Sequence, residues 1–323
     1  MSIIVPCYNE QQTISLLLAS IYRQTYPRQN FEVIIADGLS TDNTRQEIQE
    51  FQLAHPDLVV SVVDNPQRNI PSALNQAIDA ARGDYIIRLD AHSIPAEDYI
   101  ARCVAALDAK LGDNVGGLWE IQPGGDTWQA RSIARAATHP LGVGDARYRV
   151  GGTAQEVDTV PFGAFQRSLT DRVGKFDESL LTNEDYEFNT RIRRMGGKIW
   201  FDPAIKSKYI ARQNLKALAR QYWRYGYWKV RMLRRYPESF RWRQLAGIFV
   251  VSFPVLALLG IWFIWARGLL VIEIAIYLLA LILVGLQLAF KYRDFTLLWG
   301  VPLAIATMHF SWGSAFIWSM ISN

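Results

Sequence analysis

Ser2-Ile3-Ile4-Val5 is a short apolar run, and an amphipathic stretch of helical length follows it near residues 11–23. The same alternation recurs three more times along the first third of the chain. The later apolar runs are residues 31–36, 58–63 and 85–89, and the helical stretches after them are residues 44–54, 71–82 and 95–111. Strands that alternate with helices predict an α/β fold with a doubly wound, mainly parallel sheet.

Polar residues follow the ends of these predicted strands. They include Tyr8-Asn9-Glu10, Asp37 to Asp42, Asn65 to Asn69 and Asp90-Ala91-His92. In doubly wound sheets the ligand crevice lies outside the carboxyl ends of the strands, so we expect these residues to converge there. After Gly112 the pattern becomes irregular, with a strand predicted near residues 115–121. A Gly-rich stretch at residues 139–155 is interpreted as a mobile loop, either a lid, a disordered segment or a protein contact.

The composition changes sharply near residue 244, beyond which charges become rare. We therefore predict a catalytic domain at residues 1–213, an amphipathic juxtamembrane helix region at 214–243 and a membrane domain at 244–323. The apolar stretches 245–266, 269–290 and 295–320 are each long enough for the roughly 20 residues that span a bilayer, which predicts about three transmembrane helices. The chain begins directly with a strand pattern, and we expect no secretory signal.

Basic residues gather ahead of the first predicted span, with Glu238 as the one acid among them. They are Arg220, Arg224, Lys229, Arg231, Arg234, Arg235, Arg241 and Arg243. This bias predicts a multi-pass protein of the cell (inner) membrane whose catalytic domain is cytoplasmic. Because the net charge of +4 is concentrated here, anionic lipid headgroups are the expected partners and nucleic acid is not. The two cysteines lack metal-site spacing and fit a reducing compartment.

The chemistry is indicated by Asn183-Glu184-Asp185, a carboxylate pair that opens a helical stretch, and by Gln221-Tyr222-Trp223-Arg224-Tyr225 further along. A carboxylate can deprotonate an acceptor hydroxyl while an arginine stabilises a departing diphosphate, which is the chemistry of sugar transfer. The alternative is that both acids only complement the dipole of their helix.

These motifs, in this order, resemble those of the family 2 inverting glycosyltransferases, whose fold is called GT-A. The resemblance runs from Ser2 to about Lys229. It is carried by Val5-Pro6-Cys7-Tyr8-Asn9-Glu10, Asp37-Gly38-Leu39-Ser40-Thr41-Asp42, Asp90-Ala91-His92-Ser93, Asn183-Glu184-Asp185 and Gln221-Tyr222-Trp223-Arg224-Tyr225. It implies a metal-dependent, inverting hexosyltransferase whose Rossmann-like GT-A catalytic domain is followed by C-terminal transmembrane helices.

The resemblance also implies roles for individual residues. Asp185 would be the catalytic base, with Glu184 and Arg224 beside it in the reaction. The nucleotide sugar would contact Pro6, Tyr8, Glu10, Asp37, Asn69, Asp90, Gln221 and Arg224, and the acceptor would contact Gly163, Glu184, Trp223 and Tyr225. Asp90 and His92 would hold Mn²⁺ or Mg²⁺, although the family motif is Asp-x-Asp and His92 departs from it. Turn formation remains an alternative for Asp37, and helix capping for Asn69.

Within the family, the strings Val160-Pro161-Phe162-Gly163-Ala164-Phe165 and Gly196 to Pro203 are most similar to the succinoglycan-type exopolysaccharide branch. That similarity implies transfer of a hexose, glucose from UDP-glucose, to a polyprenyl-diphosphate-linked saccharide. A polyprenyl-monophosphate glycosyltransferase, a processive polysaccharide synthase and a non-catalytic membrane scaffold remain the alternatives. A homo-oligomer and pathway partners are left open.

Overall fold

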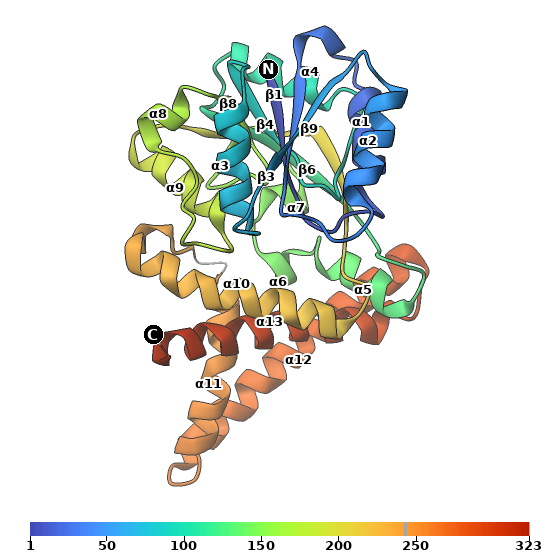
Figure 1. Ribbon diagram of the computed structural model, residues 1–323. Helices are drawn as coiled ribbons and strands as arrows, with labels where there is room; N and C mark the ends of the chain where they lie inside the picture. The colour runs from blue at the N-terminus through green and yellow to red at the C-terminus, as the bar shows by residue number, and fades with distance from the viewer. Residues whose placement is uncertain (242–243, 323) are drawn as a thin grey trace. The chain divides into compact units, whose positions relative to one another are not determined.

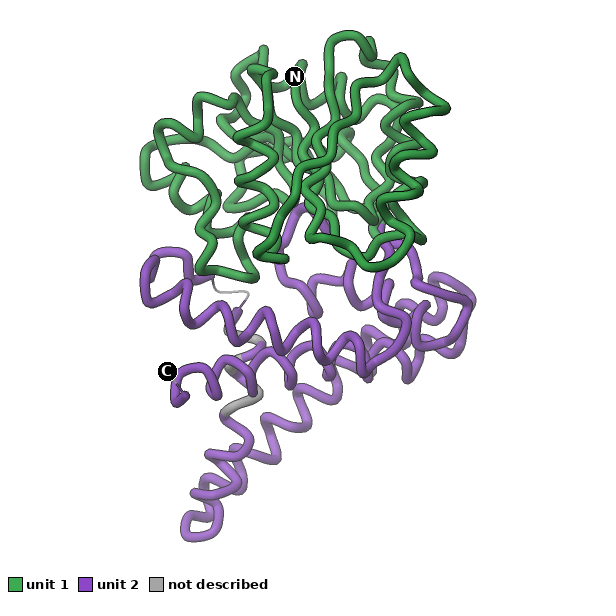
Figure 2. The backbone as a smooth tube through the Cα atoms, in the orientation of Figure 1, with its two compact units in different colours: residues 1–120, 151–209 green, residues 121–150, 210–323 purple. Residues whose placement is uncertain are grey.

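The computed structural model describes residues 1–241 and 244–322 and divides the chain into two compact units (Figure 2). Residues 1–120 and 151–209 form the first unit, and residues 121–150 and 210–323 form the second. The first unit ends close to the boundary expected at residue 213, but residues 121–150 belong with the C-terminal helices. Arg243, with the boundary predicted after it, and Asn323 lie outside the described residues.

One mixed sheet, nine-stranded over the described residues, organises the first unit. Its strands are β1 (Ser2–Cys7), β2 (Glu32–Asp37), β3 (Val59–Asp64), β4 (Tyr85–Arg88), β5 (Ile94–Pro95), β6 (Asn114–Gln122), β7 (Gln155–Glu156), β8 (Ala164–Gln166) and β9 (Ile199–Ile210). The order is β3-β2-β1-β4-β8-β6-β9-β5, and β7 pairs with β9. The first four strands are parallel. The α/β prediction is confirmed, but β8, β6, β9, β5 and β7 join through antiparallel pairs.

Helices cover the parallel strands β1, β2 and β4, which explains why these strands are buried along almost their whole length. The helices of the first unit are α1 (Ile14–Tyr22), α2 (Thr44–Ala54), α3 (Ile70–Ala80), α4 (Tyr99–Asp108), α8 (Leu169–Val173) and α9 (Glu184–Arg194) (Figure 1). Ile3 and Val5 of β1 share one core cluster with Leu17 of α1 and Ile100 of α4. Helix α3 packs on β1 and β2. The loops at the carboxyl ends of β1, β2 and β4 are thereby held at one edge.

The second unit is helical. Its helices are α5 (Trp128–Ala136), α6 (Pro140–Val143), α7 (Arg147–Val150), α10 (Leu215–Arg235), α11 (Leu245–Leu259), α12 (Ile264–Tyr292) and α13 (Leu297–Ile321). Helix α10 packs along α13, and α11 and α12 form a helical hairpin (Figure 1). Close contacts occur at glycines: a Cβ added to Gly226 would lie 2.2 Å from the carbonyl oxygen of Trp312, and one added to Gly313 would lie 2.1 Å from that of Gly247. Small residues at such crossings are typical of helices packed in membranes.

The expectation of three spans is not supported. Among the described residues, α12 is the one helix long and apolar enough to cross a membrane, and 17% of its most apolar window is buried. Helix α11 has 15 residues, fewer than the roughly 20 that a span needs. Helix α13 has 25 residues, but it buries Val301, Ile305 and Met308 within the unit. Apolar composition alone did not distinguish a helix packed against protein from one facing lipid.

Two further expectations change in the second unit. The glycine-rich stretch contains α6 and α7, and Nε2 of His309 on α13 lies 2.9 Å from the carbonyl oxygen of Leu141. The start of this stretch is therefore tied to a helix of its own unit. Lys229, expected among the lipid-headgroup anchors, is only 4% exposed, and its Nζ lies 3.3 Å from the carbonyl oxygen of Ser239. The turn after α10 covers this lysine, so it does not serve as an anchor.

Candidate active site

The site forms where three neighbouring parallel strands end. Strand β1 lies between β2 and β4. Tyr8 and Glu10 follow β1, Asp37 is the last residue of β2, and Asp90 comes two residues after β4. Parallel strands bring their carboxyl ends to one edge, so these four residues gather there as predicted.

A buried arginine, Arg88, joins the predicted metal and base motifs. It is the last residue of β4 and is 2% exposed. Its Nε donates to Oδ1 of Asp90 at 3.1 Å, and its Nη2 donates to the same oxygen at 3.0 Å and to Oε1 of Glu184 at 3.0 Å. Its Nη1 donates to Oδ1 of Asp185. The sequence interpretation did not identify Arg88, although a charged residue inside an otherwise apolar strand is itself a signal.

Helix α9 places the two acids at its first turn, where carboxylates complement the helix dipole. The helix begins after Asn183, which has a left-handed φ of 70°. Further along, the buried Glu187 accepts from Arg191 at 2.6 and 2.8 Å, and Nη2 of Arg191 donates to the carbonyl oxygen of Lys175 at 2.7 Å. These contacts connect the middle of α9 to the loop that precedes the helix.

The segment before β8 forms another wall of the site. Phe162 and Gly163 have positive φ values of 62° and 90°, conformations that an L side chain disfavours. The buried Asn189 donates to Oγ1 of Thr159 at 2.9 Å and accepts from Nδ2 of Asn114 at 2.7 Å. This buried network stabilises the strained segment. Gly163 thus has a structural reason to be glycine, and its predicted contact with the acceptor stays a prediction.

The environment of Asp185 suits a general base. Burial raises the pKa of its carboxyl to about 8 against the opposing charge of Arg88, and the acids Glu184 and Asp90 contribute to the rise. A backbone hydrogen bond from Phe162 acts in the lowering direction. The Asp185 side chain nevertheless remains 25% exposed. It is therefore a carboxylate within reach of a ligand, with proton affinity near that required at neutral pH.

The two predicted metal ligands lie in the loop after β4. Arg88 contacts Asp90 through Oδ1, and Nδ1 of His92 lies 3.1 Å from Oε1 of Glu10. The His92 side chain is 45% exposed. No group of three or more His, Cys, Asp or Glu side chains that could hold a metal occurs within residues 1–241 and 244–322. A cation at Asp90 and His92 would therefore need further ligands from the donor.

Asp37 was predicted to contact the nucleotide sugar. It is fully buried, and its Oδ2 accepts from Nε of Arg45 at 2.6 Å and from the N–H of Ser40 at 3.0 Å. Contact with a nucleobase would have to accommodate these partners. Tyr8 is 42% exposed, and the guanidinium of Arg68 lies 5.8 Å from the centre of its ring. The sequence interpretation did not identify Arg45 or Arg68.

Pro6 lies within β1, and Asn69 is the residue before α3. The Oδ1 of Asn69 accepts from the N–H of Ser72 at 2.9 Å, so this side chain caps the helix. The capping alternative for Asn69 is confirmed. Its predicted contact with the nucleotide sugar stays a prediction.

The remaining predicted residues belong to α10 of the second unit. Nε2 of Gln221 donates to the hydroxyl of Tyr225 at 2.9 Å, one turn along the helix. Trp223 is 42% exposed and Arg224 is exposed. Their predicted roles toward the diphosphate and the acceptor stay predictions.

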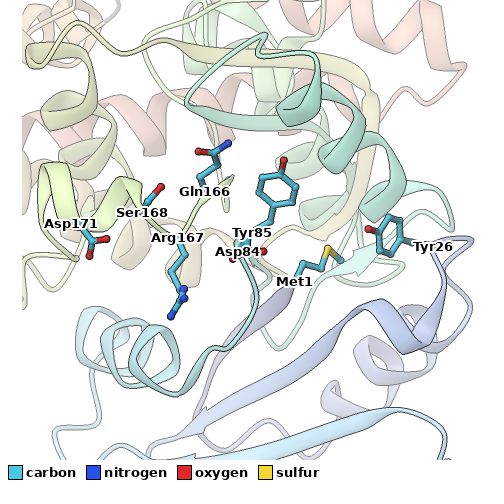
Figure 3. A pocket seen from close by; sticks show the side chains of 8 residues that line it. All are labelled: Met1, Tyr26, Asp84, Tyr85, Gln166, Arg167, Ser168 and Asp171. Carbon is cyan, nitrogen blue, oxygen red and sulfur yellow. The ribbon is translucent and has the colours of Figure 1, made fainter.

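A pocket of about 590 Å³ lies away from these residues (Figure 3). Met1 precedes β1, and Asp84 and Tyr85 stand where β4 begins, so the pocket is at the amino ends of the parallel strands. Its other lining residues are Tyr26, Gln166, Arg167, Ser168 and Asp171. None of the residues that we predicted for catalysis lines it.

Comparisons with known proteins match this geometry. A family model described as "Glycosyl transferase family 2" matches residues 2–174. "Succinoglycan biosynthesis protein ExoA" of Rhizobium meliloti (strain 1021) is 30% identical over 318 residues, covering 97% of this chain and 93% of that protein. "Dolichyl N-acetyl-alpha-D-glucosaminyl phosphate 3-beta-D-2,3-diacetamido-2,3-dideoxy-beta-D-glucuronosyltransferase" of Methanococcus voltae is 28% identical over 315 residues, covering 95% and 93%.

The solved structure of mannosyltransferase PcManGT from Pyrobaculum calidifontis, in complex with GDP-Man and Mn²⁺, superposes with a TM-score of 0.61 at 22% identity. The match covers 95% of this chain and 86% of that one. At this level of identity the superposition shows the fold. The predicted family, its succinoglycan-type resemblance and the GT-A-like fold are confirmed.

Proposed function

This chain belongs to glycosyl transferase family 2, and on that basis we propose that it is a membrane-associated, inverting, metal-dependent hexosyltransferase. The proposed donor is a UDP-hexose, with glucose as the sugar. The proposed acceptor is a polyprenyl-diphosphate-linked saccharide in exopolysaccharide or cell-surface glycan synthesis. The name of the Methanococcus voltae relative, which refers to a dolichyl-linked sugar phosphate, supports a lipid-linked saccharide as acceptor, and the name of the Rhizobium meliloti relative supports a role in exopolysaccharide synthesis.

The observation that carries the proposal is the position of Asp185. The carboxylate is one hydrogen bond from Arg88, and Arg88 also holds Asp90, the acid of the predicted metal motif. In the proposed reaction the acceptor oxygen forms a bond to the anomeric carbon as the bond from that carbon to the UDP oxygen breaks. The acceptor proton moves to Asp185, and UDP leaves with the electron pair. One displacement at that carbon inverts its configuration.

Asp90 and His92 fit a divalent cation, because a carboxylate and an imidazole are suitable ligands for Mn²⁺ and the donor diphosphate can complete the set. When bound, the cation would neutralise charge on the leaving diphosphate. Glu10 orients His92 through the 3.1 Å contact between Oε1 and Nδ1. Arg224 is proposed as a further cation for the diphosphate, since a guanidinium keeps its charge and binds phosphate oxygens in pairs.

The acceptor would be bound through its sugar hydroxyls by Glu184 and by aromatic residues such as Trp223 and Tyr225. Access to a lipid-linked acceptor is supported by the apolar surface of α12 and of the turn before it, where Trp262 and Ile264 are 69% and 81% exposed. We propose attachment to the cell membrane through this hairpin, with the catalytic unit on the cytoplasmic side. The exposed basic residues at the end of α10, Arg234 and Arg235, would then face anionic headgroups.

The decisive experiment compares Asp185→Asn with Asp171→Asn, an exposed acid on α8 that lies outside the predicted catalytic set. Each purified protein would be incubated with a radiolabelled UDP-hexose, Mn²⁺ and a polyprenyl-diphosphate sugar. We expect Asp185→Asn to lower transfer by about 10²- to 10⁴-fold, the range for loss of a general base, with donor affinity by calorimetry within a few-fold. Asp171→Asn should match the wild type. Loss of donor binding in Asp185→Asn would remove Asp185 from the role of base.

The same assay separates the alternatives. Product on bare polyprenyl phosphate would replace the proposed acceptor with that of a polyprenyl-monophosphate glycosyltransferase. Products that carry many sugars would indicate a processive synthase. Release of no UDP from any donor and acceptor pair would leave a non-catalytic scaffold and reject the enzymatic proposal.

A further inference from the structure

Arg88 pairs with more acids than the single partner of an ordinary ion pair. Its guanidinium touches three carboxylates from two separate motifs, Asp90 after β4 and Glu184 and Asp185 on α9. The two motifs are more than 90 residues apart in the chain. The exposed fractions of the three acidic side chains are 21%, 10% and 25%, so each acid keeps a solvent-facing part while Arg88 lies beneath them.

The backbone of Arg88 is held as firmly as its side chain. It ends a central strand, where its Cα pairs with that of Ile4 in β1. Its N–H donates to the carbonyl oxygen of Gly163 at 3.0 Å. Arg88 therefore connects the sheet, the strained 162–163 segment and the first turn of α9, and no flexible loop intervenes on the strand side.

The planar fork of arginine is required by this arrangement. Nε and Nη2 contact Asp90, whereas Nη1 contacts Asp185 and Nη2 also reaches Glu184. A lysine would end near the position of Cζ, one C–N bond of about 1.3 Å short of the terminal nitrogens. Its single nitrogen would lie near both Asp90 and Asp185, but it could not make the separate, oriented contacts that the three nitrogens of the fork make with Asp90, Glu184 and Asp185. Arg88→Lys would therefore preserve the positive charge but not the orientation of Asp185, the proposed base.

We propose that Arg88 is a positioning residue for the transfer step: it holds the oxygen of Asp185 in line with the donor site that Asp90 helps to build. This inference rests on the proposed function of Asp185 as the base. Because positioning acts on the reaction and less on donor binding, loss of the fork should lower kcat more than it weakens donor affinity.

The first test is Arg88→Lys, with Arg191→Lys as the matched control. Arg191 also forms a two-pronged pair, with Glu187 on the same helix, but its contacts are with Glu187 and the 173–175 backbone. We expect Arg88→Lys to lower kcat by about 100-fold, the effect of a displacement near 1 Å, while the donor Kd by calorimetry changes less than about threefold. Arg191→Lys should keep kcat within about threefold of the wild type and lose thermal stability instead.

A second pair of variants covers the case in which Arg88→Lys does not fold. Arg88→Met combined with Glu184→Gln removes one positive and one negative charge. When the acids are ionised, the net charge of the cluster is therefore the same as in the wild type. The reference is Glu184→Gln alone, because this variant already includes any effect that the loss of the Glu184 charge has on acceptor binding. The double variant should have a kcat at least about tenfold below that of the reference, with the donor Kd unchanged.

Several outcomes would overturn the inference. They are equal kcat values in either comparison, a loss confined to the donor Kd, and unfolding of both Arg88 variants, which would assign Arg88 to the fold. Failure of the proposed function is distinguishable, because in that case the wild type and Arg191→Lys would also not transfer sugar.

Discussion

Replacement of Gly163 by alanine tests the wall of the site in quantitative terms. Gly163 has φ +90°, where an L side chain costs about 1–2 kcal/mol. An added Cβ would lie 2.5 Å from Oδ1 and 2.9 Å from Nδ2 of Asn114, which is 2% exposed and bonded to Asn189. Overpacking of this kind adds about 1–3 kcal/mol. Together we expect Gly163→Ala to destabilise the protein by roughly 2–5 kcal/mol.

Gly196→Ala is the matched control. Gly196 has a similar φ of +78°, but no atom lies within 4 Å of the Cβ position. Its cost should be the backbone part alone, about 1–2 kcal/mol. The difference between the variants, about 1–3 kcal/mol, corresponds to roughly 2–12 °C in the thermal midpoint for a unit of this size. Thermal unfolding of the detergent-solubilised proteins measures it directly.

The same change should affect the reaction. The N–H of Arg88 donates to the carbonyl oxygen of Gly163, and the neighbouring Phe162 bonds the Asp185 carboxyl through its backbone. A shift of this segment by a few tenths of an ångström reaches both residues, so Gly163→Ala should lower kcat more than Gly196→Ala at a temperature where both are folded. Equal midpoints and equal kcat values for the two variants would refute the reasoning, because they would show that the Asn114 contact relaxes without cost.

Three other changes have defined outcomes. Because the pKa of Asp185 is raised to about 8, the base is protonated below that pH, and kcat should rise with pH up to about 8; a flat profile between pH 6 and 8 would argue against a titrating base. His92→Ala should weaken Mn²⁺-dependent donor binding in calorimetry, and an unchanged metal dependence would limit His92 to its contact with Glu10. Gly313→Ala should destabilise the second unit by about 2 kcal/mol or more, since its Cβ would lie 2.1 Å from a carbonyl oxygen, whereas Gly268→Ala, with open space around it, should not.

The parallel half of the sheet could be predicted because each of its strands is a local apolar run followed by a helix. Strand β2 was expected at residues 31–36 and occupies Glu32–Asp37, and the helix expected at 44–54 has those bounds. Strands β8 and β9 could not be predicted in the same way. Strand β8 has three residues, and it pairs with β4 in a register set by distant parts of the chain. Pairing over such separations leaves no periodic pattern in either strand.

The candidate site shows the same limit. Asp90 and Asp185 could be singled out because short motifs contain them, and each motif is contiguous in sequence. Arg88 could not be assigned a role, because its meaning depends on partners 96 and 97 positions later. The extent to which α13 is buried depends on distant residues in the same way. The sequence shows that Gly313 is small, but only the fold shows that a backbone carbonyl lies against it.

The exposed apolar surface of the second unit is relevant to how the proposed lipid-linked acceptor would reach the enzyme. Ile261 and Trp262 in the turn between α11 and α12 are 60% and 69% exposed, and Ile264 at the start of α12 is 81% exposed. An apolar patch of this extent is unfavourable in water and is expected to enter lipid. A polyprenyl chain requires the same medium, because its isoprene units are apolar throughout. For the lipid-linked acceptor proposed above, hairpin and acceptor lipid would share one layer, so the acceptor would diffuse to the enzyme in two dimensions. Charged substitutions at Trp262 and Ile264 should thus reduce transfer to a lipid-linked acceptor in vesicles while leaving donor binding unchanged, and equal loss with a water-soluble acceptor would contradict this reasoning.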